Sequence, residues 1–490
     1  ICIVALLGNL TGSSQFFNTI PFYNGAISTS YRNDNASNAY LYVNKGGNGD
    51  RQKFTLSWWM KLGTLDSDGD PDGTIYTSGY SGGGGSQGAA QVIFSHQRIS
   101  ISNQTSNAYD WQLISSRHFS DSSSWYHICV AFDTTQSTAS NRIKLYVNGV
   151  QETAFDTEQY PSQNDNVKFN NQHERIGTWD DSGNRYNDFD GYFADWNLID
   201  GTQLAPTSFG ETKNGVWIPV DTSSLTRGTK GWRLEFKQVG VGTASSSTVG
   251  ADTGGNDFHF TSSGIVASDC ALPDCPENNF PTMNSLDVGG AITYSEGNLK
   301  MVVSSGSMEG SRATMALPQS GKWYWEVGVA SLGYISQVGI ATAEKKLANT
   351  ADGAADHIAW GFGGWMASNN SSVSKYQVNV GGSGGDNWVA QPASGDVLGI
   401  AYDADNGKLW FAKNGTYQNT SGTANPATGA DPRASSLTGK EWFPLYAGYP
   451  ENSPNYIMNF GQDSAFAGTE TAQGNTDENG IGDFYYAPPS

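Results

Sequence analysis

Apolar and polar residues alternate in several short stretches of this chain. Residues 54–61 read Phe-Thr-Leu-Ser-Trp-Trp-Met-Lys, so that apolar side chains occupy every even-numbered position. The same alternation occurs in residues 125–132, 143–147 and 192–198, and again in residues 323–329, 398–402 and 409–412. A period of two is that of a half-buried β-strand. Because long helical periodicity is absent from both halves of the sequence, the pattern predicts an all-β chain with two antiparallel β-sandwich (jelly-roll) domains.

Two of these stretches end in the same turn signal. Residues 143–147 lead into Asn148-Gly149, and residues 409–412 lead, through Lys413, into Asn414-Gly415. Asn and Gly both tolerate a positive φ, which the two central residues of a tight hairpin turn require. The sequence therefore predicts one β-hairpin at each of these positions.

The strand-like stretches fall into two groups, separated by residues 211–280. This segment places two short apolar runs among Gly, Ser and Thr, which is typical of a connector. Within it we expect residues 252–263, rich in Gly, Asn and Asp, to be extended and exposed. The predicted organisation is an N-terminal arm at 1–14, a first sandwich at 15–210, the connector at 211–280, a second sandwich at 281–465 and a C-terminal arm at 466–490.

The amino-acid composition agrees with this organisation and excludes some classes of binding partner. The 490 residues include 60 Gly, and 12% are aromatic, as in cores of short strands joined by tight turns. Acidic residues outnumber basic ones 47 to 27, giving a net charge of -20. Such a surface repels phosphate backbones and anionic lipids, so we expect neither nucleic acid nor a membrane as partner. The apolar residues 1–8 are too short to span a bilayer, and we expect no membrane insertion.

Cysteine and histidine give little chemistry. The four cysteines are too few for a disulfide scaffold. Cys129 lies within a strand-like stretch and is interpreted as a small buried apolar residue. Cys270 and Cys275 are close enough to form a disulfide in an oxidising compartment, or are free thiols. The six His residues lack zinc-site spacing, and His127 is interpreted as a satisfied residue of its strand.

The motifs of each half resemble those of a known domain family. Residues 54–61, 124–133 (Ser-Trp-Tyr-His-Ile-Cys-Val-Ala-Phe-Asp), 144–149 and 189–201 resemble the concanavalin A-like, laminin-G-type jelly roll over about residues 15–210. Residues 321–327 (Gly-Lys-Trp-Tyr-Trp-Glu-Val), 338–341, 395–399, 409–415, 443–445 and 459–461 resemble a SPRY domain over about residues 281–465. The second resemblance implies a curved β-sandwich that presents loops to protein partners.

The pairing of the two domains carries a further resemblance. Together with residues 204–211, 254–258 and 278–284, it is similar to structural proteins of marine tailed phages, assigned to tail fibres or capsid decoration. In similar chains the sequence often continues past the Tyr-Tyr-x-Pro-Pro-Ser end, so we expect a processed product or a fragment. The resemblance implies a location on the virion surface, outside the cell.

The sequence indicates no catalytic site. Glucan-cleaving jelly rolls carry a Glu-x-Asp-x-x-Glu strand that brings two carboxylates about 5–5.5 Å apart, and this chain has no such strand. The nearest acids, Asp188, Asp190 and Asp195, have the wrong spacing. Residues 84–88 and 381–385 match the nucleophile-elbow pattern, but neither lies between a strand and a helix. We therefore predict that the chain is not an enzyme.

One acidic loop is a candidate calcium site. Asp66, Asp68, Asp70 and Asp72 occupy alternate positions, from which carboxylates can converge on a hard cation. Resemblance to laminin-G-like folds, which bind calcium at their rim, favours the same interpretation. However, the position of the closing acid in an EF-hand-like loop is Gly79, and a solvated turn is the alternative.

Aromatic residues in loops are candidates for glycan binding, because flat rings complement the C–H faces of sugars. Trp179 and Tyr186 lie in an acidic loop of the first domain. Trp365, Tyr376 and Trp388 lie in long loops of the second. The alternative is that each is a packing residue.

Taken together, these features predict a virion-surface structural protein, either a tail fibre or a capsid-attached fibre or decoration protein. It would mediate host attachment by glycan binding. The expected partners are other virion proteins, host-surface glycans or proteins, and further copies of the chain in a homo-oligomer. One alternative is a purely structural decoration or joint protein. The other is a secreted cellular lectin or adhesion protein, whose Asn-x-Ser/Thr sites would carry glycans.

Overall fold

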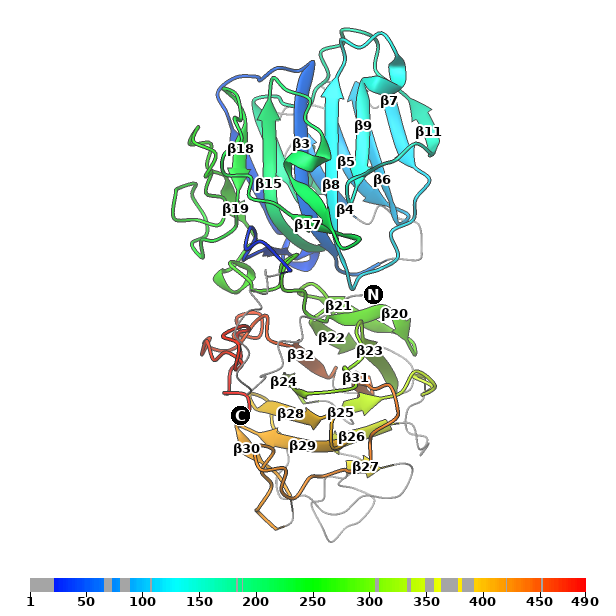
Figure 1. Cartoon of the computed structure of the whole chain (residues 1–490), viewed down its shortest axis with the longest axis vertical. Helices are drawn as coiled ribbons and strands as arrows, with labels where there is room; N and C mark the ends of the chain where they lie inside the picture. Colours follow the sequence, from blue (N-terminus) through cyan, green and yellow to red (C-terminus); the bar gives the residue numbers. More distant parts are fainter. Residues whose placement is uncertain are drawn as a thin grey trace, which may run out of the picture.

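The computed structural model describes residues 22–65, 73–79, 89–105, 108–181, 184–186, 188–304, 308–332, 336–348, 357–362, 378–380, 392–419, 421–450 and 453–490. These residues contain no α-helix and form two stacked bodies of antiparallel strands (Figure 1). The only helical turns among them are four short 3-10 helices: η1 (Asn35–Ser37), η2 (Ala139–Asn141), η3 (Pro206–Ser208) and η4 (Ala267–Asp269). The predicted all-β class with two antiparallel sandwiches is confirmed.

The first sandwich has a seven-stranded sheet of order β1-β15-β3-β8-β9-β10, with β18 also paired to β15. Its strands are β1 (Tyr31–Asn33), β3 (Lys53–Leu62), β8 (Trp125–Asp133), β9 (Ile143–Val147), β10 (Val150–Gln151), β15 (Gly191–Asp200) and β18 (Trp232–Leu234). The alternating residues 54–60 lie at its centre, where Trp58 of β3 stacks on Trp196 of β15 with ring centroids 4.5 Å apart.

The opposing sheet has eight strands in the order β11-β7-β6-β5-β4-β12-β2-β19. They are β2 (Tyr40–Asn44), β4 (Gly73–Ser78), β5 (Ala90–Ser95), β6 (Arg98–Thr105), β7 (Ala108–Ser115), β11 (Phe155–Gln159), β12 (His173–Ile176) and β19 (Thr261–Ser263). Two separate hairpins flank the sandwich: β13 (Trp179–Asp181) with β14 (Asn184–Tyr186), and β16 (Gly210–Lys213) with β17 (Val216–Pro219).

The second sandwich repeats this plan with a six-stranded sheet, β20-β23-β31-β25-β26-β27, and a seven-stranded sheet, β21-β22-β32-β24-β28-β29-β30. The first contains β20 (Met283–Val288), β23 (Glu309–Ala313), β25 (Ser336–Ala341), β26 (His357–Phe362), β27 (Val378–Val380) and β31 (Phe443–Gly448). The second contains β21 (Ile292–Ser295), β22 (Lys300–Val303), β24 (Lys322–Ser331), β28 (Val397–Asp403), β29 (Lys408–Lys413), β30 (Thr416–Tyr417) and β32 (Asn455–Asn459).

Both predicted hairpins are present. Asn148 and Gly149 join β9 to β10 with φ angles of 48° and 79°, and Asn414 and Gly415 join β29 to β30 with φ angles of 50° and 74°. Both turns thus place two successive residues in the left-handed region, as a tight hairpin requires.

Residues 211–280 add a strand to each sheet of the first sandwich, because β18 pairs with β15 and β19 pairs with β2. The expectation that residues 252–263 are exposed is wrong for Asp252, Phe260 and Ser262, whose exposed fractions are 6%, 0% and 7%. The Asp252 carboxylate accepts backbone N–H bonds from Arg233, Gly254 and Phe258. Phe260 meets Trp232 edge to face in the core. Part of this polar segment can therefore be buried, because the Asp252 carboxylate accepts hydrogen bonds from the backbone N–H groups around it.

Residues 466–490 lie against the second sandwich although they form no strand. Phe466 is fully buried, and Phe484 is 5% exposed. The buried Glu326 of β24 accepts the backbone N–H groups of Tyr485 and Tyr486 at 2.8 and 2.7 Å. One carboxylate on the outer face of the sheet thus holds the C-terminal segment in place.

The three described cysteines are buried free thiols. This confirms the interpretation of Cys129, which has no exposed surface. Cys270 and Cys275 are not joined in the structure, and burial raises the pKa of both thiols to about 12. Both are therefore held in the unreactive, protonated form.

Candidate functional site

The outer face of the eight-stranded sheet carries one continuous row of polar and aromatic residues. Along β2 and β12 the side chains of Leu41, Val43 and Ile176 point into the core, so their neighbours point outward. The register of the sheet aligns these outward positions across all eight strands. In order from β19 to β11, the row is Thr261, Tyr42, Arg175, Thr77, Gln91, Ser102, Gln112 and Gln159.

An aromatic and basic cluster lies at one end of this row. The guanidinium of Arg175 stands 5.0 Å from the centre of the Tyr42 ring. The His173 ring lies nearly parallel to that of Tyr42, and its Nδ1 is 3.0 Å from the tyrosine hydroxyl. All three side chains are half-buried. We call these three residues the Tyr42 cluster; they place a cation over an aromatic ring, with an imidazole ring nearly parallel to it.

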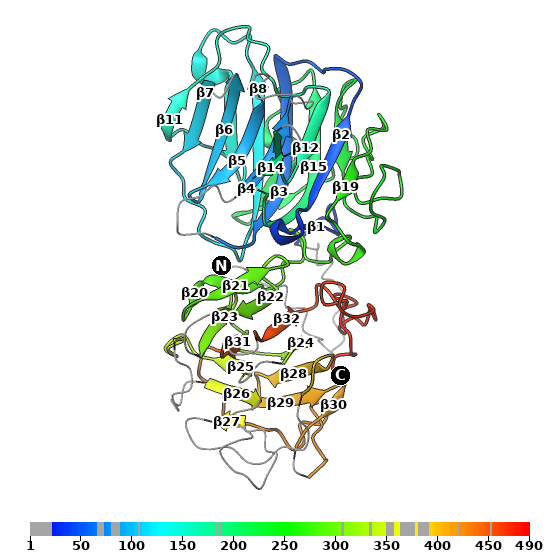
Figure 2. The ribbon, with the colours of Figure 1, turned by 180° about the vertical axis from the view of Figure 1, so that it is seen from behind.

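The middle of the row is closed off from solvent. Thr77, Gln91 and Ser102 are between 1% and 4% exposed. Within the part of the chain that the structure describes, Gln91 Nε2 and Ser102 Oγ have no hydrogen-bond partner. Thr77 donates a hydrogen bond of 3.2 Å to the carbonyl of Thr178, at the base of the β13–β14 hairpin. The hairpin thus meets the row beside Arg175, the cross-strand partner of Thr77 (Figure 2).

The structure brings two of the predicted glycan-binding residues together. Trp179 and Tyr186 are direct cross-strand partners in the β13–β14 hairpin, and Trp179 is half-buried. Thr178, which precedes Trp179, also donates a hydrogen bond to Asp188. The other three predicted residues, Trp365, Tyr376 and Trp388, lie outside the described residues.

The acidic loop of Asp66, Asp68, Asp70 and Asp72 also lies outside the described residues, but both of its flanks are described. Gly73, which follows the loop, comes so close to the chain at Phe189 that an added Cβ would lie 2.5 Å from the Phe189 Cα. β4 therefore begins next to the segment that follows the hairpin. Among the described residues, no group of three or more His, Cys, Asp or Glu side chains could hold a metal ion.

Sequence reasoning missed the Tyr42 cluster. The signal was present, because residues 40–44 read Tyr-Leu-Tyr-Val-Asn and alternate like the other strands. The pattern does not show which strand lies beside residues 40–44. His173 and Arg175 lie more than 130 residues further along the chain from Tyr42.

Comparison with known proteins agrees with this architecture. Residues 34–204 match the model of the concanavalin A-like lectin/glucanases superfamily, and residues 322–430 match that of the SPRY domain. The chain carries a concanavalin A-like domain and a SPRY domain. No curated protein matches the chain in sequence.

Several solved structures are similar to part of this chain at low sequence identity. The SPRY domain of human HERC1 is 14% identical, with a TM-score of 0.27, over 37% of this chain and 97% of that one. A human SPRY domain is 15% identical, with a TM-score of 0.26, over 36% and 98%. The heptameric SAP-like pentraxin from Limulus polyphemus is 13% identical, with a TM-score of 0.26, over 36% and 78%.

His127 lies on the outer face of the other sheet of the concanavalin A-like domain, and the structure confirms that it is satisfied. Its Nδ1 accepts a hydrogen bond of 3.1 Å from the Trp217 indole, so Nε2 carries the ring proton and donates to Ser57 Oγ at 2.9 Å. Burial lowers the pKa of His127 to about 3. A ring whose Nε2 is already protonated cannot take the proton of Ser57, so this pair is not a nucleophile with its base.

The three clustered acids of the concanavalin A-like domain bind different partners. Asp188 accepts the Thr178 hydroxyl, Asp190 accepts the backbone N–H of Thr64 at 2.9 Å, and Asp195 pairs with Arg233 at 2.8 Å. Burial raises the pKa of Asp190 to about 6.

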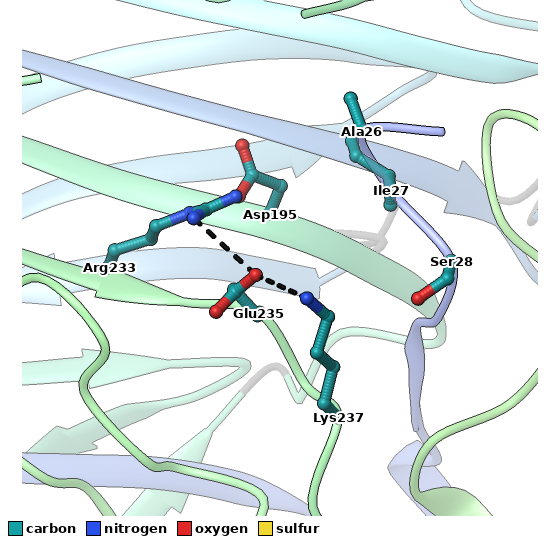
Figure 3. A pocket seen from close by; sticks show the side chains of 7 residues that line it. All are labelled: Ala26, Ile27, Ser28, Asp195, Arg233, Glu235 and Lys237. Atoms are coloured by element: carbon teal, nitrogen blue, oxygen red, sulfur yellow. Dashed lines mark hydrogen bonds and ion pairs between the residues drawn. The ribbon is translucent and has the colours of Figure 1, made fainter. Parts of the chain in front are cut away.

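Two depressions in the surface of the described residues are small. Figure 3 shows a surface depression of about 160 Å³, open solvent included, in which Glu235 lies between Arg233 and Lys237. A neighbouring one measures about 250 Å³. Sites for small molecules usually measure about 300–1,000 Å³, and the charges here are already paired with one another. In addition, none of the described residues forms a helix that could cross a membrane. The Tyr42 cluster and the adjoining hairpin are the strongest candidate for recognition among the described residues.

Proposed function

We propose that this chain is an attachment protein whose concanavalin A-like domain binds glycans at the Tyr42 cluster and the adjoining hairpin. Both domains are of kinds compatible with binding or adhesion. The single observation that carries the proposal is the Tyr42 cluster, in which Arg175 stands over the Tyr42 ring near one end of the polar row.

The chemistry of the cluster suits a sugar. An aromatic ring packs against the C–H face of a pyranose, and neighbouring donors bind its hydroxyl groups. Arg175 has five N–H donors in a planar fork, which also suit the carboxylate of an acidic sugar. Trp179 adds a second ring next to Thr178, where the hairpin meets the row. A polyanion such as nucleic acid is disfavoured by the net charge of -20.

The wider role rests on the resemblance of the paired domains to phage structural proteins. In this proposal the chain is a tail fibre or a capsid-attached fibre or decoration protein, and it acts without catalysis. Loops of the SPRY domain contact other virion proteins. Several copies in a homo-oligomer would raise weak single-site binding by avidity.

A glycan array tests the binding site. We expect the full chain to bind a subset of glycans, and both Arg175→Met and Trp179→Ala to weaken that binding about tenfold or more, because each removes one contact worth roughly 1–2 kcal/mol. The matched control is Lys144→Met, a half-buried cation on the outer face of the opposite sheet. Unchanged binding by both variants, with native thermal stability, would exclude the Tyr42 cluster as the site.

A purely structural role is the second candidate, favoured by the buried contacts that fix the two domains together. Microscopy of an intact particle decides between the two roles when combined with the array. A chain located on the particle, without binding to any glycan, would support a decoration or joint protein. Absence of the chain from purified virions would contradict both and leave the secreted lectin, for which Asn35 and Asn414 are the exposed described glycosylation sites.

A further inference from the structure

A buried arginine lies at the contact between the two sandwiches. Arg32 of β1 is fully buried and forms ion pairs with three carboxylates. One of them, Asp269 of η4, belongs to the first domain and lies at 2.7 Å. The other two, Glu296 and Asp463, belong to the SPRY side and both lie at 3.1 Å. A single cation of the first domain thus binds two anions of the second.

Direct hydrogen bonds surround this arginine. The Tyr192 hydroxyl donates to the carbonyl of Gly297 at 3.0 Å, and the Glu296 backbone N–H donates to Asp34 at 3.1 Å. The backbone N–H of Leu65 donates to the Ser285 hydroxyl at 3.2 Å. A Cβ added to Gly297 would lie 2.4 Å from the Tyr192 hydroxyl. The two domains therefore meet in close contact at the turn between β21 and β22.

Negative charge exceeds positive charge at this contact. If all three carboxylates around Arg32 are ionised, the group carries an excess of two negative charges. The charged and titratable groups that face Glu296 and Arg32 from the surrounding elements are Asp34, Asp190, Tyr192, Asp269, Cys270, Lys300 and Asp463. Only one further cation, Lys300 on β22, belongs to this set. Buried like charges repel one another, and one proton would relieve the repulsion.

We infer that the contact between the domains is a proton-controlled lock, in which protonation of Glu296 tightens the closed arrangement around Arg32. Glu296 is the carboxylate of the three with the most contact with water, since its side chain is 15% exposed and those of Asp269 and Asp463 are each 3% exposed. It can thus exchange a proton without the domains separating.

The direction follows from the pKa of Glu296. Burial, with Asp34 and Asp269 adding to it, raises this pKa from 4.5 to about 7, although Arg32 acts to lower it. When the domains separate, Glu296 returns to water and to its ordinary pKa. Between pH 4.5 and about 7 the closed form therefore binds a proton that the open form does not. Closing is favoured as the pH falls through this range and is weakened as the pH rises through it, with no further change well above pH 7.

Linkage gives the expected size. For one group with these two pKa values, the equilibrium constant for opening rises about tenfold between pH 6 and pH 8. The added charge at pH 8 lies beside Asp34 and Asp269, which contribute to the raised pKa.

Hydrogen–deuterium exchange measures this opening in the full chain. The backbone amides of Leu65 and Glu296 are suitable reporters, because each donates its hydrogen bond across the contact. After correction for intrinsic exchange, we expect their protection to fall about tenfold from pH 6 to pH 8. In Glu296→Gln, whose amide is neutral at every pH, protection should stay near the pH 6 value. Glu441→Gln, which removes an exposed carboxylate elsewhere, should behave as the unmodified chain does.

The outcomes separate the lock from a merely structural contact. Gly297→Ala, which forces the domains apart at Tyr192, should lower protection at both pH values and so shows that the reporters sense opening. Equal protection of the unmodified chain at pH 6 and pH 8 would overturn the inference. So would an unaltered pH dependence in Glu296→Gln, provided that its calorimetric unfolding shows both domains folded.

Discussion

The environment of His127 decides how the first domain responds to acid. The ring is buried without a neighbouring anion, and burial alone lowers its pKa to about 3. The unfolded chain binds the proton at an ordinary pKa near 6.5. The stability contributed by the neutral ring is therefore complete above pH 6.5 and is lost as the pH falls below it, by about 1.4 kcal/mol per pH unit for one proton.

We predict that His127→Gln makes the first domain less stable at pH 7 but less sensitive to acid. The loss at pH 7 should be about 1–3 kcal/mol, because Ser57 or Trp217 then lacks a well-placed partner. Between pH 6 and pH 4 the free energy of unfolding should fall less steeply than in the unmodified chain. Denaturant unfolding at several pH values measures both effects. His118→Gln, at an exposed histidine, is the control and should leave the slope unchanged.

Single residues were predictable where their neighbours along the strand decide the outcome. The burial of Cys129 and the satisfied state of His127 followed from the alternation of residues 125–132. Arg32 was not predictable, because its partners Asp269 and Asp463 lie 237 and 431 residues away. Nothing in the local pattern distinguishes a buried arginine with three carboxylates from an exposed one. Buried charge is stable only with partners that the complete fold supplies.

Two hairpin turns of the first domain have the same backbone conformation and different surroundings. Gly149 follows β9 with a φ of 79°, and Gly215 joins β16 to β17 with a φ of 82°. A Cβ added to Gly149 would lie 2.4 Å from the Trp217 ring, whereas one added to Gly215 would meet nothing within 4 Å. The hairpin β16–β17 thus packs its Trp217 against the turn of the hairpin β9–β10.

Alanine substitutions at these two glycines distinguish the cost of backbone strain from the cost of overpacking. Gly215→Ala should cost about 1 kcal/mol, the penalty for a left-handed alanine. Gly149→Ala should cost roughly 1–3 kcal/mol more, because Trp217 must move and overpacking is destabilising. Trp217 fluorescence should change in Gly149→Ala and stay constant in Gly215→Ala. Equal losses of stability in the two variants would show that the contact with Trp217 contributes nothing.

At the scale of elements, the turns and the two faces of each strand were predictable from the sequence, but the pairing between strands was not. Asn-Gly specifies a hairpin through the φ angles of two adjacent residues, so both hairpins followed from four letters of sequence. The row across the eight-stranded sheet depends on pairings such as β2 with β12, which join residues 42 and 175. A strand's alternation shows which side chains share a face and leaves open which strand lies beside it. The Tyr42 cluster therefore became visible only in the folded chain.

At the scale of the whole molecule, two domains and their order were predictable from the motifs, whereas the contact between them was not. Residues of β1, η4, the β21–β22 turn and the segment after β32 meet at Arg32. Figure 2 shows β1 at the end of the first domain that faces β21 and β22. These four segments come from both ends and the middle of the sequence. Thr64 and Leu65 of the first domain also donate hydrogen bonds across this contact, to Asn298 and Ser285.

We predict that Arg32→Leu uncouples the unfolding of the two domains. Leucine leaves Asp269 and Asp463 buried without their cation, and breaking a buried pair in this way costs about 3–5 kcal/mol. Because Asp463 is held by the SPRY side and Asp269 by the first domain, the cost falls on the contact rather than on either core. Differential scanning calorimetry should show one cooperative transition for the unmodified chain and two for the variant.

The control is Arg117→Leu, which removes a half-exposed arginine from its pair with Glu152. This variant should keep the single transition and shift its temperature little. A single transition in Arg32→Leu at an unchanged temperature would mean that Arg32 does not join the domains, and the coupling would then have to come from the hydrogen bonds across the contact, such as those of Tyr192, Glu296 and Leu65.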